Sequence, residues 1–316
     1  MKYFFAGIEG SGMAGLASML FDSGNEVIGC DDAKVYSFTL EELDKRGIKI
    51  YKDADKLTKD MIDVYTSAVH SDHYSYKKAK ELGCKMYEYY EMIGELTKKY
   101  NTISICGTHG KTTTTAMLSN ILYNTIGTNY VIGDGTGVVL KGSNNFVVES
   151  CEFNRHFLNY YPKYTIITNI FYDHVDCYNN IEEIIETFQK FVDQTEETVI
   201  ACGDNENVRK LKSDKIIYYG FNEDNDVRGV IKELREDGSS FDVYIKGEFF
   251  GSFDISIFGK HMIENALACI YMSYLEGVSL EDITKYLNEF HGAKRRFSEE
   301  KIGDVVLVDD YAHHPN

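Results

Sequence analysis

The stretch that decides the fold is Thr102-Ile103-Ser104-Ile105-Cys106-Gly107-Thr108-His109-Gly110-Lys111-Thr112. It begins as a short apolar run and then passes through two glycines that stand three residues apart. Beyond it, apolar residues recur at the spacing of one helix face, at Met117, Leu118, Ile121 and Leu122. A strand, a glycine loop and a helix in this order form the repeating unit of a parallel α/β sheet. We therefore predict a strand over Thr102–Cys106 and a helix after the loop.

The residues of this loop suit a nucleoside triphosphate with magnesium. Such a ligand needs several N–H groups aimed at one point, a cation near the β and γ oxygens, and a hydroxyl for Mg²⁺. Two glycines allow the backbone to wrap closely, Lys111 supplies the cation, and Thr112 supplies the hydroxyl. Ile105 stands where the common G-x-x-x-x-G-K-[ST] pattern has its first glycine, so a chance Gly-Lys-Thr is the alternative. The predicted ATP ligands of the loop are Gly107, Thr108, His109, Gly110, Lys111 and Thr112.

Similar units recur along the chain and predict an α/β fold with mainly parallel sheets. A chain of 316 residues exceeds the size of one hydrophobic core, and polar stretches near residues 97–101 and 294–297 suggest boundaries. We predict domains at 1–98, 99–297 and 298–316, the last being the first strand of a further domain that lies beyond this sequence. An antiparallel insert is expected at Phe241–Ile245 and Phe249–Phe258. The other predicted strands are Lys2–Ala6, Glu26–Cys30, Val64–Ser67, Phe146–Glu149, Thr165–Thr168, Thr198–Cys202, Ile216–Tyr218 and Val305–Val308.

Composition excludes several classes of function. The formal charge of -17 argues against a nucleic-acid binder and against binding to an anionic membrane surface. Seven scattered cysteines, without a C-x-x-C pair, indicate reduced thiols and not a disulfide frame or a zinc site. The apolar run at the N-terminus is too short for a signal peptide, and no stretch is long enough to span a membrane. We expect a cytoplasmic protein.

A second glycine motif lies near the N-terminus, in Gly10-Ser11-Gly12-Met13-Ala14-Gly15. It fits G-x-G-x-x-G between the strand Lys2–Ala6 and a helix, and acidic residues follow about twenty positions later. This indicates a Rossmann-like domain. From these residues alone the ligand is a nicotinamide dinucleotide, another diphosphate, or none.

Charged side chains follow two of the predicted strands. Glu149 closes one strand, and Asp173, His174 and Asp176 follow the next. The carboxyl ends of parallel strands share one edge of a sheet, where ligands and Mg²⁺ collect. We expect these residues beside the loop, although a solvated strand end or a hydrogen-bonded turn would explain each of them separately. Lys294-Arg295-Arg296 is either a phosphate clamp or a solvated surface.

Taken together, these segments resemble the Mur ligase family, the ATP-dependent amide-forming enzymes of peptidoglycan synthesis. The resemblance covers the whole chain and rests on Gly7–Met13, Gly107–Thr113, Ile132–Gly137, Glu149–Glu152 with Arg155–Leu158, Thr168–Ile170 with Asp173-His174, Gly292–Phe297 and Asp309–Pro315.

The resemblance implies a role for each of several residues. The N-terminal domain would bind a UDP-sugar, which displaces the nicotinamide interpretation, through Gly10, Ser11, Gly12, Met13, Asp31 and Ser67. The ATP site would gain Thr113, Asn265, Arg296 and Asp310. Two Mg²⁺ ions are implied, one held by Thr112 and Glu149 and the other by His174. The catalytic residues would be Lys111, Glu149 and His174.

Within the family, the chain is most similar to the members that join L-alanine to UDP-N-acetylmuramate through an acyl phosphate. Members that attach a whole murein peptide to the same UDP-sugar are the near alternative. A nicotinamide-dependent oxidoreductase and a non-catalytic regulator are the alternatives of other classes. We expect this chain alone to make little or no product, while its oligomeric state stays open.

Overall fold

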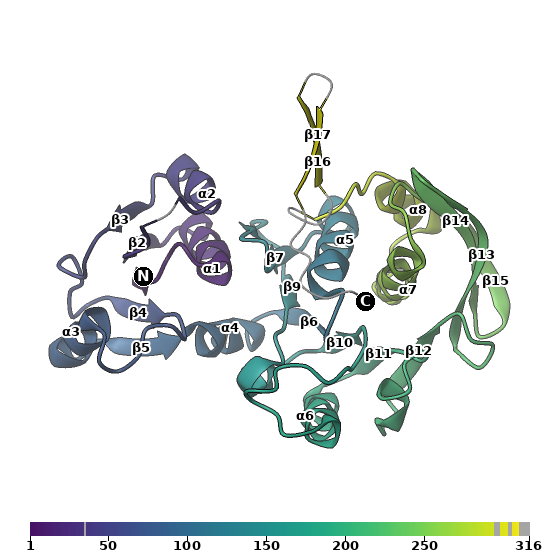
Figure 1. Cartoon of the computed structure of the whole chain (residues 1–316), viewed down its shortest axis with the longest axis horizontal. Coiled ribbons are helices and arrows are strands. Elements are labelled where there is room, and N and C mark those ends of the chain that lie inside the picture. The colour runs from purple at the N-terminus through teal and green to yellow at the C-terminus, as the bar shows by residue number, and fades with distance from the viewer. Residues whose placement is uncertain (35, 294–297, 303–304, 310–316) are drawn as a thin grey trace. The chain divides into compact units, whose positions relative to one another are not determined.

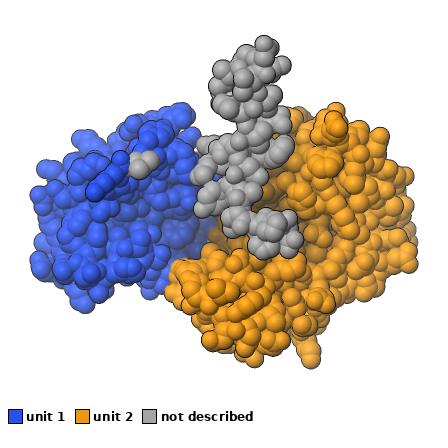
Figure 2. Space-filling model, in the orientation of Figure 1, with its two compact units in different colours: residues 1–102, 128–148, 159–161 blue, residues 103–127, 149–158, 162–316 orange. Residues whose placement is uncertain are grey.

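The computed structural model describes residues 1–34, 36–293, 298–302 and 305–309. The chain forms two compact units, which Figure 2 shows in different colours. Unit 1 comprises residues 1–102, 128–148 and 159–161, and unit 2 comprises residues 103–127, 149–158 and 162–316. The domain boundaries placed after residues 98 and 297 remain predictions.

Unit 1 contains a five-stranded parallel sheet in the order β3-β2-β1-β4-β5 (Figure 1). The strands are β1 (Lys2–Ala6), β2 (Glu26–Cys30), β3 (Lys49–Tyr51), β4 (Ile62–Tyr65) and β5 (Lys85–Glu88). The helices are α1 (Ser11–Asp22), α2 (Leu40–Lys45), α3 (Tyr74–Leu82) and α4 (Tyr89–Thr97). Strand β1 pairs with β2 on one side and with β4 on the other. The order of the strands therefore reverses at β1, and ligands of such sheets bind at this reversal.

Three further strands follow the glycine loop in the sequence. Their residues up to residue 148 pack with unit 1. They are β7 (Asn129–Val131), β8 (Gly137–Val138) and β9 (Asn145–Glu149). Helix α1 lies against β8, where a Cβ added at Gly137 would stand 1.8 Å from the carbonyl oxygen of Gly15. A Cβ at Gly15 would itself stand 3.1 Å from the carbonyl oxygen of Thr136, so the third glycine of the N-terminal motif also serves close backbone packing.

The sheet of unit 2 carries parallel strands at its centre and an antiparallel extension at one edge. Its parallel strands are β6 (Asn101–Cys106), β10 (Tyr164–Ile167), β11 (Thr198–Cys202) and β12 (Ile216–Gly220). The extension consists of β13 (Val227–Arg235), β14 (Gly238–Ile245) and β15 (Glu248–Ile255). The predicted α/β class and the antiparallel insert are confirmed. Strand β13 was missed because its charged residues and one irregular register step obscure the two-residue alternation.

Helices cover this sheet and complete the core of unit 2 (Figure 1). They are α5 (Lys111–Asn124), α6 (Ile181–Gln194), α7 (Lys260–Leu275) and α8 (Leu280–Asn288). Helix α7 packs against α5 and α8 as well as against the sheet, so most of its residues are buried. None of the described helices is long and apolar enough to cross a bilayer.

The C-terminal segment differs from its prediction. The strand expected at Val305–Val308 is present as β17 (Val305–Asp309), but it pairs antiparallel with β16 (Ser298–Ile302). Strand β16 was missed because it contains three consecutive charged residues and no apolar run. Arg296 and Asp310, two of the residues assigned to the ATP site, lie outside the described residues.

Candidate active site

The glycine loop connects β6 to α5 and has a backbone that only glycine adopts easily. Gly107 and Gly110 have φ angles of 133° and 82°. A Cβ at Gly107 would also stand 2.1 Å from Oγ1 of Thr168. Gly110 is the N-cap of α5 and has no side chain to cap it. Because the helix begins here, the positive end of its dipole faces the loop. Conformation and packing both require glycine in this loop.

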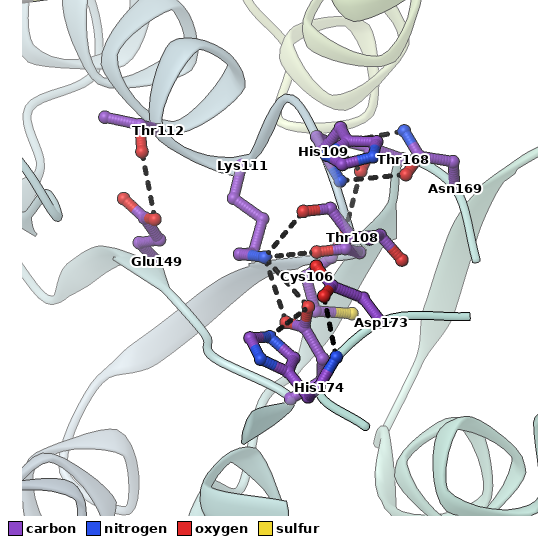
Figure 3. A network of polar contacts seen from close by, with 12 residues as sticks. Cys106, Thr108, His109, Lys111, Thr112, Glu149, Thr168, Asn169, Asp173 and His174 are labelled. Atoms are coloured by element: carbon purple, nitrogen blue, oxygen red, sulfur yellow. Dashed lines mark hydrogen bonds and ion pairs between the residues drawn. The ribbon is translucent and has the colours of Figure 1, made fainter. Parts of the chain in front are cut away.

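The end of β10 holds the loop in shape (Figure 3). The Thr108 N–H donates to the carbonyl of Asn169 at 3.0 Å, and the His109 N–H donates to Asn169 Oδ1 at 2.8 Å. The Thr168 hydroxyl donates to the His109 carbonyl at 2.6 Å. Thr168 and Asn169 therefore stabilise the conformation of the glycine loop, in which His109 lies 60 residues before Asn169 in the sequence.

Lys111 lies at the mouth of the loop, with its ammonium surrounded by oxygen atoms. Its Nζ donates to the carbonyls of Gly107 and Thr108 and forms an ion pair with Glu152, 2.9 Å from Oε2. Burial alone would lower the pKa of Lys111, but the nearby groups of Glu152, Cys151 and Glu149 together outweigh burial and raise that pKa, with Glu152 the largest of the three. In Glu152, burial acts to raise the pKa of the carboxyl, but Lys111 together with hydrogen bonds from His174 and the backbone outweighs burial and lowers that pKa. Both groups are charged at neutral pH.

Thr112 and Glu149 meet at the same edge. The Thr112 hydroxyl donates to Glu149 Oε1 at 3.0 Å, which joins the first turn of α5 to the last residue of β9 (Figure 3). A hydroxyl and a carboxylate are the oxygen ligands that Mg²⁺ prefers. Among the described residues, no three His, Cys, Asp or Glu side chains gather as a metal cage.

His174 reaches the site from the loop after β10. It has a φ angle of 53°, which is uncommon for a residue other than glycine, and its N–H donates to Asp173 Oδ1 at 2.7 Å. Its Nε2 lies 3.5 Å from Oε1 of Glu152. The hydrogen bond with Glu152 raises the pKa of His174. Lys111 and His174 therefore share one carboxylate.

Among the other residues assigned to the ATP site, Asn265 lies against the loop. It is a buried residue of α7, and a Cβ at Gly110 would stand 2.9 Å from its Oδ1. Thr113 is buried in the first turn of α5. Asp176 lies two residues beyond His174 and accepts a bond from Cys177. Glu152 was not assigned a role, because the sequence shows two glutamates in one motif without showing which of them reaches Lys111.

The residues assigned to the UDP-sugar lie along one edge of the sheet of unit 1. Gly10 is the N-cap of α1, and Ser11, Gly12 and Met13 open that helix. The side chain of Met13 is 2% exposed and belongs to the core, so only its backbone is open to a ligand. Asp31 follows β2 and accepts bonds from the N–H groups of Glu9 and Ala33, which shapes its own loop. Ser67 is exposed just after β4.

The chain is similar in sequence to known proteins over two consecutive segments. Residues 2–101 match the Mur ligase family, catalytic domain, and residues 105–273 match the Mur ligase middle domain. The chain is 42% identical over 316 residues to a UDP-N-acetylmuramate–L-alanine ligase of Lactiplantibacillus plantarum. That alignment covers 99% of this chain and 72% of the relative.

Two solved structures extend the comparison. A UDP-N-acetylmuramate–alanine ligase of Thermotoga maritima has a TM-score of 0.86 and 27% identity, covering 100% of this chain and 75% of that one. A UDP-N-acetylmuramate:L-alanyl-γ-D-glutamyl-meso-diaminopimelate ligase from Neisseria meningitides has a TM-score of 0.80 and 26% identity. It covers 93% of this chain and 100% of its own.

Proposed function

This chain belongs to the Mur ligase family, and we propose that it is an ATP-dependent ligase that joins L-alanine to UDP-N-acetylmuramate. The observation that carries the proposal is the convergence of Lys111, Thr112 and His174 on two carboxylates at the end of β9. This places a cation and a metal-type hydroxyl together at the start of a helix, which is the arrangement that a triphosphate needs. The 42% identity to an L-alanine ligase supports the choice of amino acid.

The chain's own residues account for binding and orientation of the triphosphate. Lys111 would neutralise the β and γ oxygens, while the first turn of α5 directs its dipole at the same phosphates. Thr112 and Glu149 would hold one Mg²⁺ and His174 a second. When bound, these ions supply positive charge to the oxygens of the transferred phosphoryl group. Asn265, which lies against Gly110, would border the nucleotide.

The chemistry follows from the poor reactivity of a carboxylate. An oxygen of the lactyl carboxylate attacks the γ-phosphorus of ATP, the bond to the β-phosphate oxygen breaks, and ADP leaves. The neutral amine of L-alanine then attacks the carbonyl carbon of the acyl phosphate. A C–N bond forms, the C–O bond to phosphate breaks, inorganic phosphate departs, and the amine gives up a proton. Lys111 would stabilise the charge of the first step.

The UDP-sugar is assigned to unit 1, at the edge where the strand order reverses. Gly10 has a φ angle of -60°, and a Cβ there would meet only ordinary contacts at 3.5 Å or more. The chain's own packing therefore does not require glycine at this position. A closely approaching diphosphate at the start of α1 would require it, because a side chain would obstruct the backbone N–H groups.

The alternatives receive less support. A peptide-attaching ligase is represented by the Neisseria meningitides structure, whose TM-score of 0.80 is lower than the 0.86 of the Thermotoga maritima alanine ligase. The identities to these two structures are nearly equal, at 26% and 27%, so the 42% identity to the Lactiplantibacillus plantarum enzyme supports the choice of L-alanine. A nicotinamide-dependent oxidoreductase would leave the loop of Lys111 and its carboxylates without a role.

An ADP-release assay tests the proposal. The assay uses the full-length protein, because this chain alone is expected to make little or no product. The protein is incubated with ATP, Mg²⁺, UDP-N-acetylmuramate and each amino acid in turn, and the product is identified by mass spectrometry. We expect ADP release that depends on the UDP-sugar and is greatest with L-alanine. The same assay on Glu149→Ala separates this activity from contaminating ATPases. Release that is independent of the sugar, or that requires a peptide in place of L-alanine, would contradict the proposal.

A further inference from the structure

We propose that Glu152 is a positioning residue that couples the binding of phosphate to the binding of metal, because one carboxylate holds both Lys111 and His174. The inference rests on the proposed function and adds a residue to it. Lys111 is the cation assigned to the phosphates, and His174 is assigned to a metal ion. Glu152 would fix the position of the Lys111 ammonium and the orientation of the His174 ring.

The carboxylate of Glu152 is itself buried and lies near both nitrogen groups. Its side chain is 2% exposed, and Lys111 Nζ lies 3.1 Å from Oε1 and 2.9 Å from Oε2. His174 Nε2 lies 3.5 Å from Oε1. A carboxylate buried this deeply is unfavourable unless it is paired, and attraction between charges is stronger where water is excluded. The three side chains therefore form one unit, in which moving one member changes the other two.

Hydrogen bonds and the following turn fix the position of the Glu152 backbone. Its carbonyl accepts hydrogen bonds from the Arg155 N–H at 3.0 Å and from the hydroxyl of Tyr178, which is 1% exposed. Asn154 and Arg155, which follow, have φ angles of 49° and 61°. Two consecutive left-handed residues that are not glycine are unfavourable, so surrounding contacts must hold this turn in place.

Glu149 and Glu152 contact different groups of the site. Glu149 accepts from the Thr112 hydroxyl, whereas Glu152 faces the two nitrogen groups. A carboxylate facing Nε2 of His174 leaves Nδ1 as the ring nitrogen for a ligand, and such outer carboxylates commonly orient metal-binding histidines. Lys111 has three N–H bonds but four oxygen atoms within 3.1 Å, so an arriving phosphate oxygen replaces one or more of these acceptors.

The test compares the affinity for ADP with and without Mg²⁺, measured by isothermal titration calorimetry on the wild-type protein and on Glu152→Gln. We expect the enhancement of ADP affinity by Mg²⁺ to fall roughly tenfold or more in the variant, the size typical of lost outer-shell partners. Binding of ADP without metal should be unchanged or tighter, because Lys111 has lost a competing anion. A merely structural role would weaken both affinities equally, and that result would overturn the proposal.

Two further variants support this experiment, one as a control and one as a substitute for Glu152→Gln. Glu183→Gln removes the same charge from a glutamate that pairs with Arg155, and it should leave the Mg²⁺ enhancement at the wild-type value. Should Glu152→Gln fail to fold, Glu152→Asp keeps the charge on a shorter side chain and should still reduce the enhancement. An unchanged enhancement in Glu152→Asp would then overturn the proposal. If the wild-type protein binds no ADP at all, the proposed function itself fails, which is a distinguishable result.

Discussion

Asp63 offers a stability prediction that can be worked out from its surroundings. It is fully buried in β4, where its register partners are Phe4 of β1 and Met86 of β5. Neither of its carboxylate oxygens has a hydrogen-bond partner among the described residues. Burial raises the pKa of Asp63 from 3.8 to about 7. We expect Asp63→Asn, which keeps the shape but cannot ionise, to stabilise unit 1 at alkaline pH.

The direction of the pH effect on stability follows from the protonation of Asp63 in the folded and unfolded states. At pH values below 3.8 the carboxyl is protonated in both states, so it has no pH-dependent effect. Between 3.8 and about 7 the unfolded chain loses the proton first, so the folded state loses stability as pH rises. Above this range the penalty is constant, and it amounts to about 4 kcal/mol. The advantage of Asp63→Asn should therefore grow by about 2 kcal/mol between about pH 5.5 and about pH 8.5.

Urea unfolding at both pH values measures this difference. Hydrogen exchange at β1 and β4 reports unit 1 separately from unit 2. Asp60→Asn serves as the control, because the hydrogen bond with Lys2 lowers the pKa of Asp60 to about 2. Both states of Asp60 are ionised throughout this pH range, so its effect should not vary with pH. An advantage of Asp63→Asn that is equal at both pH values, or a destabilisation at the higher pH, would refute the reasoning.

Two other substitutions test the glycine loop. Lys111→Met should abolish binding of ADP measured by calorimetry and destabilise the chain by about 3–5 kcal/mol, because it leaves Glu152 buried without its cation; unaltered ADP binding would contradict this. Gly107→Ala should also lose ADP binding, since its Cβ would stand 2.1 Å from Thr168 Oγ1. Gly142→Ala, where φ is also positive but no atom lies within 4 Å, is the matched control and should bind normally. Equal effects of the two alanines would show that backbone strain alone is responsible.

Much of the site could be predicted because its chemistry is local in sequence. The spacing of Gly107, Gly110 and Lys111 indicates a phosphate loop wherever it stands between a strand and a helix. Glu149 and His174 could be placed beside it because parallel strands end at a common edge. These inferences need only the order of the elements, which the alternation of apolar patterns provides.

The remaining features depend on contacts between distant segments. Whether Glu149 or Glu152 reaches Lys111 is decided by the turn after β9, with its left-handed Asn154 and Arg155. The roles of Thr168 and Asn169 in holding the loop depend on the register of β10 against β6, in which Ile167 pairs with Cys106. Strands β7 and β8 join unit 1 through backbone packing on α1, and a pattern of apolar residues cannot express such packing.

The central claim is that one edge of the sheet in unit 2 binds a metal–triphosphate complex. The most direct measurement is a crystal structure with Mn²⁺ and a non-hydrolysable ATP analogue, in which anomalous scattering locates the metal. The account predicts Mn²⁺ bound to Thr112 Oγ1 and Glu149, with Lys111 Nζ at the phosphates. Metal and phosphates bound at a different edge, or analogue bound with Lys111 still paired only to Glu152 and the loop carbonyls, would contradict it.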